Sequence, residues 1–189
     1  MQGDEGSAGY RTRIERLHSE LGVPPGFAEQ RGWPLQPEAA SLAEAGPDWY
    51  GRSQQLRPDA LAAWRRLQQA AAEDGVTVHL ISAFRSVDYQ CEVIRRKLAA
   101  GRTMEDILQV NAVPGFSEHH TGCAVDLGTT DCPALEEAFE HTPAFRWLAE
   151  HARRFGFHLS YPRDNTMGIH YEPWHWCYWP DLDKTATRE

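Results

Sequence analysis

Two short blocks of the sequence concentrate side chains that can bind a metal ion. The first block holds His119, His120 and Asp126, and the second holds His170, Glu172 and His175. A catalytic zinc site takes three nitrogen or oxygen ligands from the protein and keeps one position open for water. A further carboxylate beside the metal can take the proton of that water. The two blocks together hold enough side chains for both tasks, which points to metal-assisted hydrolysis.

The spacing within each block sets a geometric condition on such a site. Glu172 and His175 are three residues apart and would point to opposite faces of a regular strand. Pro173 lies between them, and proline occurs at strand ends and bulges, where side chains change direction. In the first block, Gly122 lets the chain turn between His119 and the strand that carries the aspartate. Both pairs can therefore reach one ion.

The blocks belong to a set of three ordered motifs. The motifs are S-A-F-R-S at residues 82–86, S-E-H-H-T-G-C-A-V-D at residues 117–126 and E-P-W-H at residues 172–175. In this order they resemble the zinc D-alanyl-D-alanine carboxypeptidases of the VanY type, a likeness that runs from Leu56 to Tyr178. Three motifs in the right order are far more specific than any one of them alone.

The resemblance implies roles for seven residues. One Zn²⁺ per chain would be bound by His119, Asp126 and His175, with Glu172 as the general base and Arg85 stabilising the oxyanion, while Gln90 and Ser117 would contact the terminal D-Ala. Side-chain chemistry is consistent with these roles, because two neutral imidazoles and one carboxylate leave one positive charge on the dication. That charge can lower the pKa of a bound water from 15.7 toward ~7. A fixed guanidinium beside an oxyanion contributes about 3–4 kcal/mol in comparable acyl-transfer sites.

Some nearby side chains have more than one interpretation. His120 is expected to orient a neighbouring group or to line the cleft, because its side chain should diverge from that of the preceding histidine. His170 either supports the site or lies on the surface. Trp174, Trp176 and Trp179 fit the core or a cleft wall better than a platform for stacking sugars.

Hydrophobic periodicity and capping residues predict the elements that position these groups. Helices are expected at residues 10–21, 58–74, 87–100, 103–110 and 142–155. Strands are expected at residues 76–84, 123–127, 157–160 and 168–176. Helices and strands are interspersed without regular crossovers, which favours an α+β fold. We expect a small, mostly antiparallel sheet flanked by helices, with the zinc site in a surface cleft.

The length of 189 residues, 41% of them apolar, is typical of one ordinary globular domain. Between residues 24 and 57, proline, glycine and tryptophan interrupt any period. We therefore expect an N-terminal helix and an irregular wrapping segment over residues 1–55, the zinc carboxypeptidase domain over 56–180 and a tail over 181–189. The four cysteines lack C-x-x-C spacing, which favours reduced thiols, and two disulfides in an oxidising compartment are the alternative.

Charge and apolar runs limit the partners and the location. The 19 basic and 27 acidic residues give a net charge of −8, which repels phosphate backbones and anionic lipids, so nucleic acid is not an expected partner. The longest apolar runs fall far below the ~20 residues that cross a bilayer, and residues 1–10 do not resemble a signal peptide. We expect a cytoplasmic protein with no membrane span, or a periplasmic or cell-envelope protein if a leader has been removed.

Three functions are compatible with these residues. The first is removal of the terminal D-Ala from a peptidoglycan stem peptide or muropeptide, at the D-Ala-D-Ala bond of a pentapeptide or the L-to-D bond of a tetrapeptide. The second is a peptidoglycan endopeptidase on the same fold, which would need an open cleft. The third is a non-catalytic, zinc-stabilised binding domain, which would be expected to lack the base or the arginine. Gln90 and Ser117 favour the first function, and the presence of Glu172 and Arg85 counts against the third.

Overall fold

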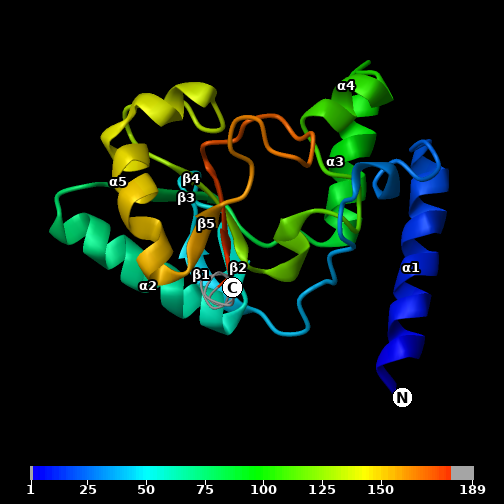
Figure 1. Cartoon of the computed structure of the whole chain (residues 1–189), viewed down its shortest axis with the longest axis horizontal. Coiled ribbons are helices and arrows are strands. Elements are labelled where there is room, and N and C mark those ends of the chain that lie inside the picture. Colours follow the sequence, from blue (N-terminus) through cyan, green and yellow to red (C-terminus); the bar gives the residue numbers. More distant parts are fainter. Residues whose placement is uncertain (1, 180–189) are drawn as a thin grey trace, which may run out of the picture.

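Four short antiparallel strands form the central sheet (Figure 1). The computed structural model describes residues 2–179, with side chains from residue 8 onward. The strands are β3 (His79–Ser82), β4 (Ala124–Gly128), β5 (Phe157–Leu159) and β6 (His175–Tyr178), in the order β3-β4-β6-β5. The expected α+β class, with a small antiparallel sheet flanked by helices, is confirmed.

The described residues form five α-helices. They are α1 (Gln2–Leu21), α2 (Pro58–Glu73), α3 (Val87–Ala99), α4 (Met104–Gln109) and α5 (Pro143–His151). The side chains of Ser86, Thr103 and Thr142 accept hydrogen bonds from the first turns of α3, α4 and α5 and so cap these helices. The last part of the helix expected at 142–155 is the 3₁₀ turn η4 (Ala152–Phe155).

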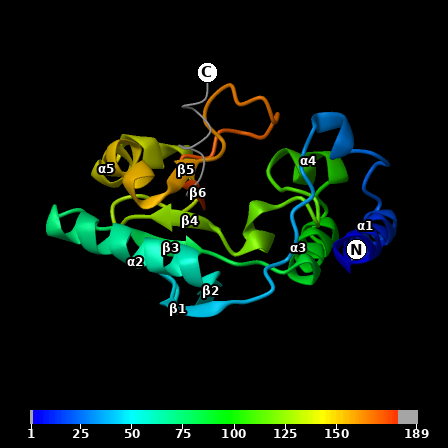
Figure 2. The same ribbon diagram turned by 60° about the horizontal axis from the view of Figure 1, so that its bottom comes forward.

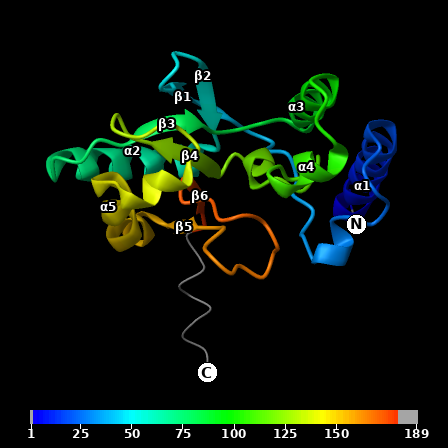
Figure 3. The same ribbon diagram turned by 90° about the horizontal axis from the view of Figure 1, so that it is seen from above.

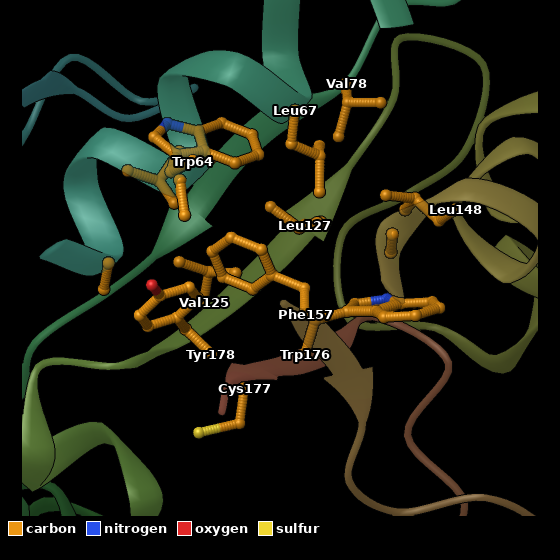
Figure 4. Packing of buried hydrophobic residues seen from close by; sticks show 14 of the residues in the cluster. Trp64, Leu67, Val78, Val125, Leu127, Leu148, Phe157, Trp176, Cys177 and Tyr178 are labelled. Carbon is orange, nitrogen blue, oxygen red and sulfur yellow. The ribbon is translucent and has the colours of Figure 1, made fainter. Parts of the chain in front are cut away.

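The helices fall into two groups at opposite ends of the molecule. In all three views α2 and α5 lie beside the sheet at one end, while α1, α3 and α4 gather at the other (Figures 1, 2 and 3). Each group has its own hydrophobic cluster. The sheet cluster is centred on residues such as Trp64, Leu127, Phe157 and Trp176 (Figure 4). The helical cluster joins Ile14 of α1 to α3 and α4.

The irregular segment expected before residue 57 is partly wrong. Its last part is an antiparallel hairpin of β1 (Ala43–Pro47) and β2 (Ser53–Leu56), with a bulge between Glu44 and Gly46. Neither strand contains a β-branched or aromatic residue, so β propensity gives no signal here. The turn is stabilised instead by the buried Asp48 carboxylate, which accepts backbone N–H groups of Tyr50 and Arg52 at 2.9 Å each.

Two predicted strands are wrong in their bounds. The strand expected at 76–84 is only β3, and the strand expected at 168–176 begins at His175. Residues 160–174 form a loop in which the backbone at Asp164 and Gly168 has positive φ, outside the β region of backbone conformation. The Asn165 side chain ties this loop together by donating to the carbonyls of Pro162 and Ile169.

Three other expectations concern the whole chain. The four cysteines are free thiols, as their spacing favoured. Within the described part of the chain, no helix has the length and apolar character needed to cross a bilayer. The expected tail at 181–189 lies outside the described residues.

Candidate metal centre

Three elements bring His119, Asp126 and His175 together. Asp126 on β4 lies opposite His175 on β6 in the register of the sheet, and the 3₁₀ turn η2 (Glu118–Thr121) carries His119. All three side chains are buried. One ligand atom from each lies within 4.8 Å of the other two, so the cluster could hold a metal ion. These are the three residues at which the sequence predicts a zinc site.

His119 is held with one ring nitrogen facing Asp126. Its Nδ1 lies 2.6 Å from the carbonyl of Ala83 and donates to it, which fixes the tautomer. Its Nε2 is buried 3.3 Å from Asp126 Oδ1 and has no hydrogen-bond partner among the described residues. Burial lowers the pKa of His119 to about 4. A neutral imidazole with an unpartnered nitrogen is the form that binds a metal.

His175 lies between two carboxylates, one of which the sequence analysis missed. Its Nδ1 is 3.1 Å from Asp126 Oδ1, and its Nε2 is 2.9 Å from Glu118 Oε2. Burial acts to lower the pKa of His175, but the hydrogen bonds to Asp126 and Glu118 outweigh it and raise the pKa to about 10. The negative charges around this ring make the cluster attractive to a cation.

Glu118 is itself positioned by a third element. The hydroxyl of Ser160, directly after β5, donates to Glu118 Oε2 at 2.6 Å. Glu118 lies inside the second motif, next to His119. This position was the one signal in the sequence that could have pointed to Glu118. Its partner His175 is 57 residues away in the chain, so the contact itself could not be read from the sequence.

A tight turn brings Glu172 to the same place. The backbone N–H of Glu172 donates to the carbonyl of Tyr161, and its carbonyl accepts the N–H of His175 at 3.0 Å across the Pro173 turn. The carboxylate Oε2 then lies 3.8 Å from His175 Nδ1. Burial raises the pKa of Glu172 to about 7, and the Asp126 charge adds to this effect. Proline at this turn redirects the two side chains, as the sequence predicted.

Arg85 follows β3 and is anchored through its backbone. Its N–H donates to the carbonyl of His119, and its carbonyl accepts from Nδ1 of His120 at 2.6 Å. His120 in turn accepts the N–H of Gly115, so it orients neighbouring backbone, one of its two expected roles. The guanidinium Nη2 lies 3.5 Å from Asp126 Oδ2, while Nε is buried without a hydrogen-bond partner in the part of the chain described. Donors therefore remain for an oxygen atom in the cavity.

A small cavity of about 50 Å³ opens beside these groups. Its lining includes six of the seven predicted site residues, namely Arg85, Gln90, Ser117, His119, Glu172 and His175. Gln90 donates from Nε2 to the carbonyl of Ala112 at 2.8 Å, and its Oε1 is buried without a partner among the described residues. Asp126 lines a second cavity of about 380 Å³, which shares Arg85 and Glu172 with the first.

The residues with open interpretations fall in different places. His170 is exposed and lines the larger cavity. Trp174 lines that cavity too and packs against the sheet cluster. Trp176 is a core residue, 3% exposed. A site with two imidazoles and a carboxylate around one point, and a second carboxylate and a guanidinium beside it, is typical of a metal-dependent hydrolase.

A comparison with protein families identifies the class. The family model for D-alanyl-D-alanine carboxypeptidase, named VanY, matches residues 53–181, more than half of the chain. The chain therefore belongs to the VanY family of D-alanyl-D-alanine carboxypeptidases.

Individual relatives agree with this assignment. A D-alanyl-D-alanine carboxypeptidase of Enterococcus faecalis is 34% identical over 122 residues, which cover 59% of this chain and 44% of the relative. The solved structure of the LD-carboxypeptidase LdcB has a TM-score of 0.70 at 27% identity, covering 81% of this chain and 74% of that one. A variant of the D,D-pentapeptidase VanY, solved in complex with Zn(II), has a TM-score of 0.60 at 28% identity, with 80% and 89% covered. The chain spans less than half the length of the first curated relatives it matches.

Proposed function

We propose that this protein is a zinc-dependent carboxypeptidase that removes the terminal D-Ala from peptidoglycan stem peptides. The observation that carries the proposal is the cluster of His119, Asp126 and His175 at a cavity that also presents Glu172 and Arg85. Relatives named D-alanyl-D-alanine and LD-carboxypeptidases support the substrate class, and the Zn(II) complex of a solved relative supports the metal.

The residues present fit a zinc ion. The unpartnered Nε2 of buried His119 points to Asp126, and two nitrogen donors with one carboxylate form a common catalytic donor set. Zinc bound there would supply Lewis acidity, lowering the pKa of a water toward about 7 and polarising the scissile carbonyl. Because the Nε2–H of His175 donates to Glu118, Glu118 would hold His175 in the tautomer that has no proton on Nδ1. The Nδ1 lone pair would then be available to the zinc ion.

Glu172 and Arg85 then divide the remaining chemistry. The Glu172 carboxylate takes the proton of the attacking water as the carbon–oxygen bond forms, and it returns that proton to the leaving amine as the carbon–nitrogen bond breaks. The free guanidinium donors of Arg85 stabilise the negative charge on the former carbonyl oxygen. A water molecule is consumed, and the products are a shortened peptide and free D-Ala.

The two cavities favour an exopeptidase over an endopeptidase. The 50 Å³ cavity has room for the side chain and carboxylate of one small residue, whereas the 380 Å³ cavity, which shares Arg85 and Glu172 with it, can take the rest of the peptide. Gln90 and Ser117 line the small side, where the terminal residue would sit. A non-catalytic binding domain would have no use for Glu172 and Arg85 in these positions.

The test is release of D-Ala, followed by mass spectrometry, from matched muropeptide tetrapeptide and pentapeptide. Zinc-loaded protein is expected to release D-Ala from one of them, and chelation is expected to abolish the release. The substrate that reacts identifies the bond. If zinc is bound and neither peptide reacts, the carboxypeptidase assignment is wrong.

A further inference from the structure

Trp33 lies on the wall of the small cavity, although it stands 20 residues before the family match begins at residue 53. The segment that follows α1 carries it to the site. The apolar side chains of the lining are those of Trp33, Leu108, Val110, Ala112 and Ile169, together with the ring of Tyr161. Separate parts of the chain thus supply them: the N-terminal segment, α4 with the residues after it, and the loop before β6.

The indole of Trp33 is fixed on both sides. It is 6% exposed within the helical cluster, and the ring of Phe27 meets it edge-on at a centroid distance of 5.7 Å. Its Nε1–H donates to the carbonyl of Met167 at 2.7 Å. That hydrogen bond joins the N-terminal segment to the loop that carries Ile169. The wall is therefore rigid where it meets the cavity.

The polar side chains of the lining are also held in place. Gln90 is hydrogen-bonded to the carbonyl of Ala112, and His119 to that of Ala83. Neither side can move back easily, so the volume of about 50 Å³ limits what can enter. A water molecule needs roughly 10–15 Å³ on this measure, so the cavity holds roughly four water-sized groups. The methyl group and carboxylate of a terminal alanine are four heavy atoms and match that size, whereas the side chain and carboxylate of a leucine are seven.

We propose that Trp33 is a specificity-determining residue that restricts the terminal residue of the substrate to the size of alanine. This inference rests on the proposed carboxypeptidase function, which places the terminal residue in the small cavity. The Trp33 indole acts directly, because an extra methylene or isopropyl group on the terminal residue of the substrate would collide with it. It also acts through its hydrogen bond to Met167, which keeps Ile169 in place.

The proposal predicts how substrate preference depends on the wall. A packed apolar pocket discriminates about 10- to 200-fold for each methylene that does not fit. The wild-type protein should therefore strongly prefer D-Ala over D-Val and D-Leu in peptides that are otherwise identical. Replacing Trp33 by leucine or alanine should reduce the kcat/KM ratio of D-Ala to D-Leu peptides by about 10-fold or more.

The experiment compares zinc-loaded wild type with the Trp33→Ala, Trp33→Leu and Ile169→Ala variants on peptides ending in D-Ala, D-Val or D-Leu. Trp33→Leu keeps apolar packing if the alanine variant does not fold, and Ile169→Ala enlarges the cavity at a second position of the apolar lining. Trp33→Phe removes the hydrogen bond to Met167 and keeps an aromatic ring, although a smaller one. The matched control is Trp49→Ala, because Trp49 is 51% exposed and lines a different surface. Folding and zinc content are checked for each variant.

The outcomes distinguish failure of the Trp33 proposal from failure of the proposed carboxypeptidase function. A relaxed D-Ala preference in Trp33→Leu and Ile169→Ala, with Trp49→Ala unchanged, supports the proposal. Equal hydrolysis of D-Ala and D-Leu peptides by the wild type, or an unchanged ratio in folded Trp33 variants, overturns it while leaving the carboxypeptidase function intact. If the zinc-loaded wild type releases no terminal residue from any peptide, the proposed function fails and this inference fails with it.

Discussion

Glu172 is the residue on which turnover should depend most directly. Its carboxylate is partly buried beside His175 and lines both cavities. We expect Glu172→Gln to lower kcat by about 10²–10⁴-fold, the usual contribution of a general base. Zinc content should stay the same, because the three ligands are untouched. The measurements are D-Ala release and metal analysis of the same sample.

The control for that variant is Glu105→Gln, which makes the same change at an exposed position on α4. It should leave kcat unchanged. Undiminished turnover in Glu172→Gln would refute the role of Glu172 as the base, and loss of zinc would instead assign it to the metal site.

Glu118 should act on the affinity for the metal. Its carboxylate receives the Nε2–H of His175 and the hydroxyl of Ser160, so it sets both the tautomer and the angle of the ring. Removing such a partner commonly weakens metal binding by 10–100-fold. We expect Glu118→Ala to show a loss of about this size in a chelator competition assay, and Ser160→Ala a smaller one. Unchanged zinc affinity in Glu118→Ala would show that His175 needs no partner at Nε2.

At the scale of elements, the β1–β2 hairpin depends on one buried acid. Asp48 accepts the N–H groups of Tyr50 and Arg52, and the Arg52 guanidinium approaches it to 2.7 Å. Burial acts to raise the pKa of Asp48, but these hydrogen bonds outweigh it and hold the pKa below its ordinary value. We expect Asp48→Ala to reduce the free energy of unfolding by about 1–3 kcal/mol, because its hydrogen bonds with the backbone of Tyr50 and Arg52 are lost.

The lowered pKa also fixes the sign of the pH dependence. The stabilisation by the ionised Asp48 is fully present above its unfolded pKa of about 3.9 and is lost as the pH falls through the lower folded value. The stability difference between wild type and Asp48→Asn, measured by urea unfolding, should therefore be constant near neutral pH and shrink below about pH 4. Asp131→Asn, at an exposed position, serves as the control. A difference that grows in acid would contradict the assignment.

The same hairpin is an element that could not be predicted from the sequence, in contrast to several of the helices. Helices with a capping threonine or serine, or a first-turn proline, were predictable because those signals are local. The hairpin was not, since neither of its strands contains a β-branched or aromatic residue. Residues 168–174 of the loop were taken for part of a strand because their apolar residues give no sign of the turns fixed by Asn165.

The residues of the site also divide into those that could be predicted from the sequence and those that could not. Six of the seven predicted residues lie within three motifs of fixed internal spacing, and Gln90 lies four residues after the first of them. The structure brings all seven to two adjoining cavities. Glu118 and Trp33 were missed because each acts through a partner far away in sequence. His175 lies 57 residues from Glu118, and Met167 lies 134 residues from Trp33. Spacing within a motif carries no information about contacts at that range.

At the scale of the whole molecule, the site lies where the sheet cluster and the helical cluster meet. Residues 113–121, which carry Ser117 and His119, are attached to the N-terminal region at several points. The carbonyls of Gly115 and His120 accept N–H groups of Gln36 and Ala39, and His18 lies 2.7 Å from the carbonyl of Pro114. The N-terminal region is thus part of the support of the metal centre, beyond the residues that the family match covers.

Ile14 of α1 gives this coupling a test. It is 2% exposed, and its side chain lies 2.8 Å from where a Cβ on Gly115 would stand, so it packs directly on the loop that leads to His119. Replacing a buried isoleucine by alanine costs about 2–5 kcal/mol, and by valine about 0.5–1.5 kcal/mol. We expect Ile14→Ala and Ile14→Val to lower the free energy of unfolding by these amounts.

If the two clusters form one cooperative unit, the loss from Ile14→Ala should appear in a single transition. Far-ultraviolet circular dichroism reports the helices, and tryptophan fluorescence reports Trp64, Trp147 and Trp176 in the sheet cluster as well as Trp33. The two signals should change together with the same midpoint. Zinc should raise that midpoint in the wild type and in Ile14→Ala alike, because a ligand that binds only the folded chain stabilises all of it. Separate transitions, with the fluorescence of the sheet cluster unaffected by Ile14→Ala, would show that the N-terminal region folds by itself and does not support the metal centre.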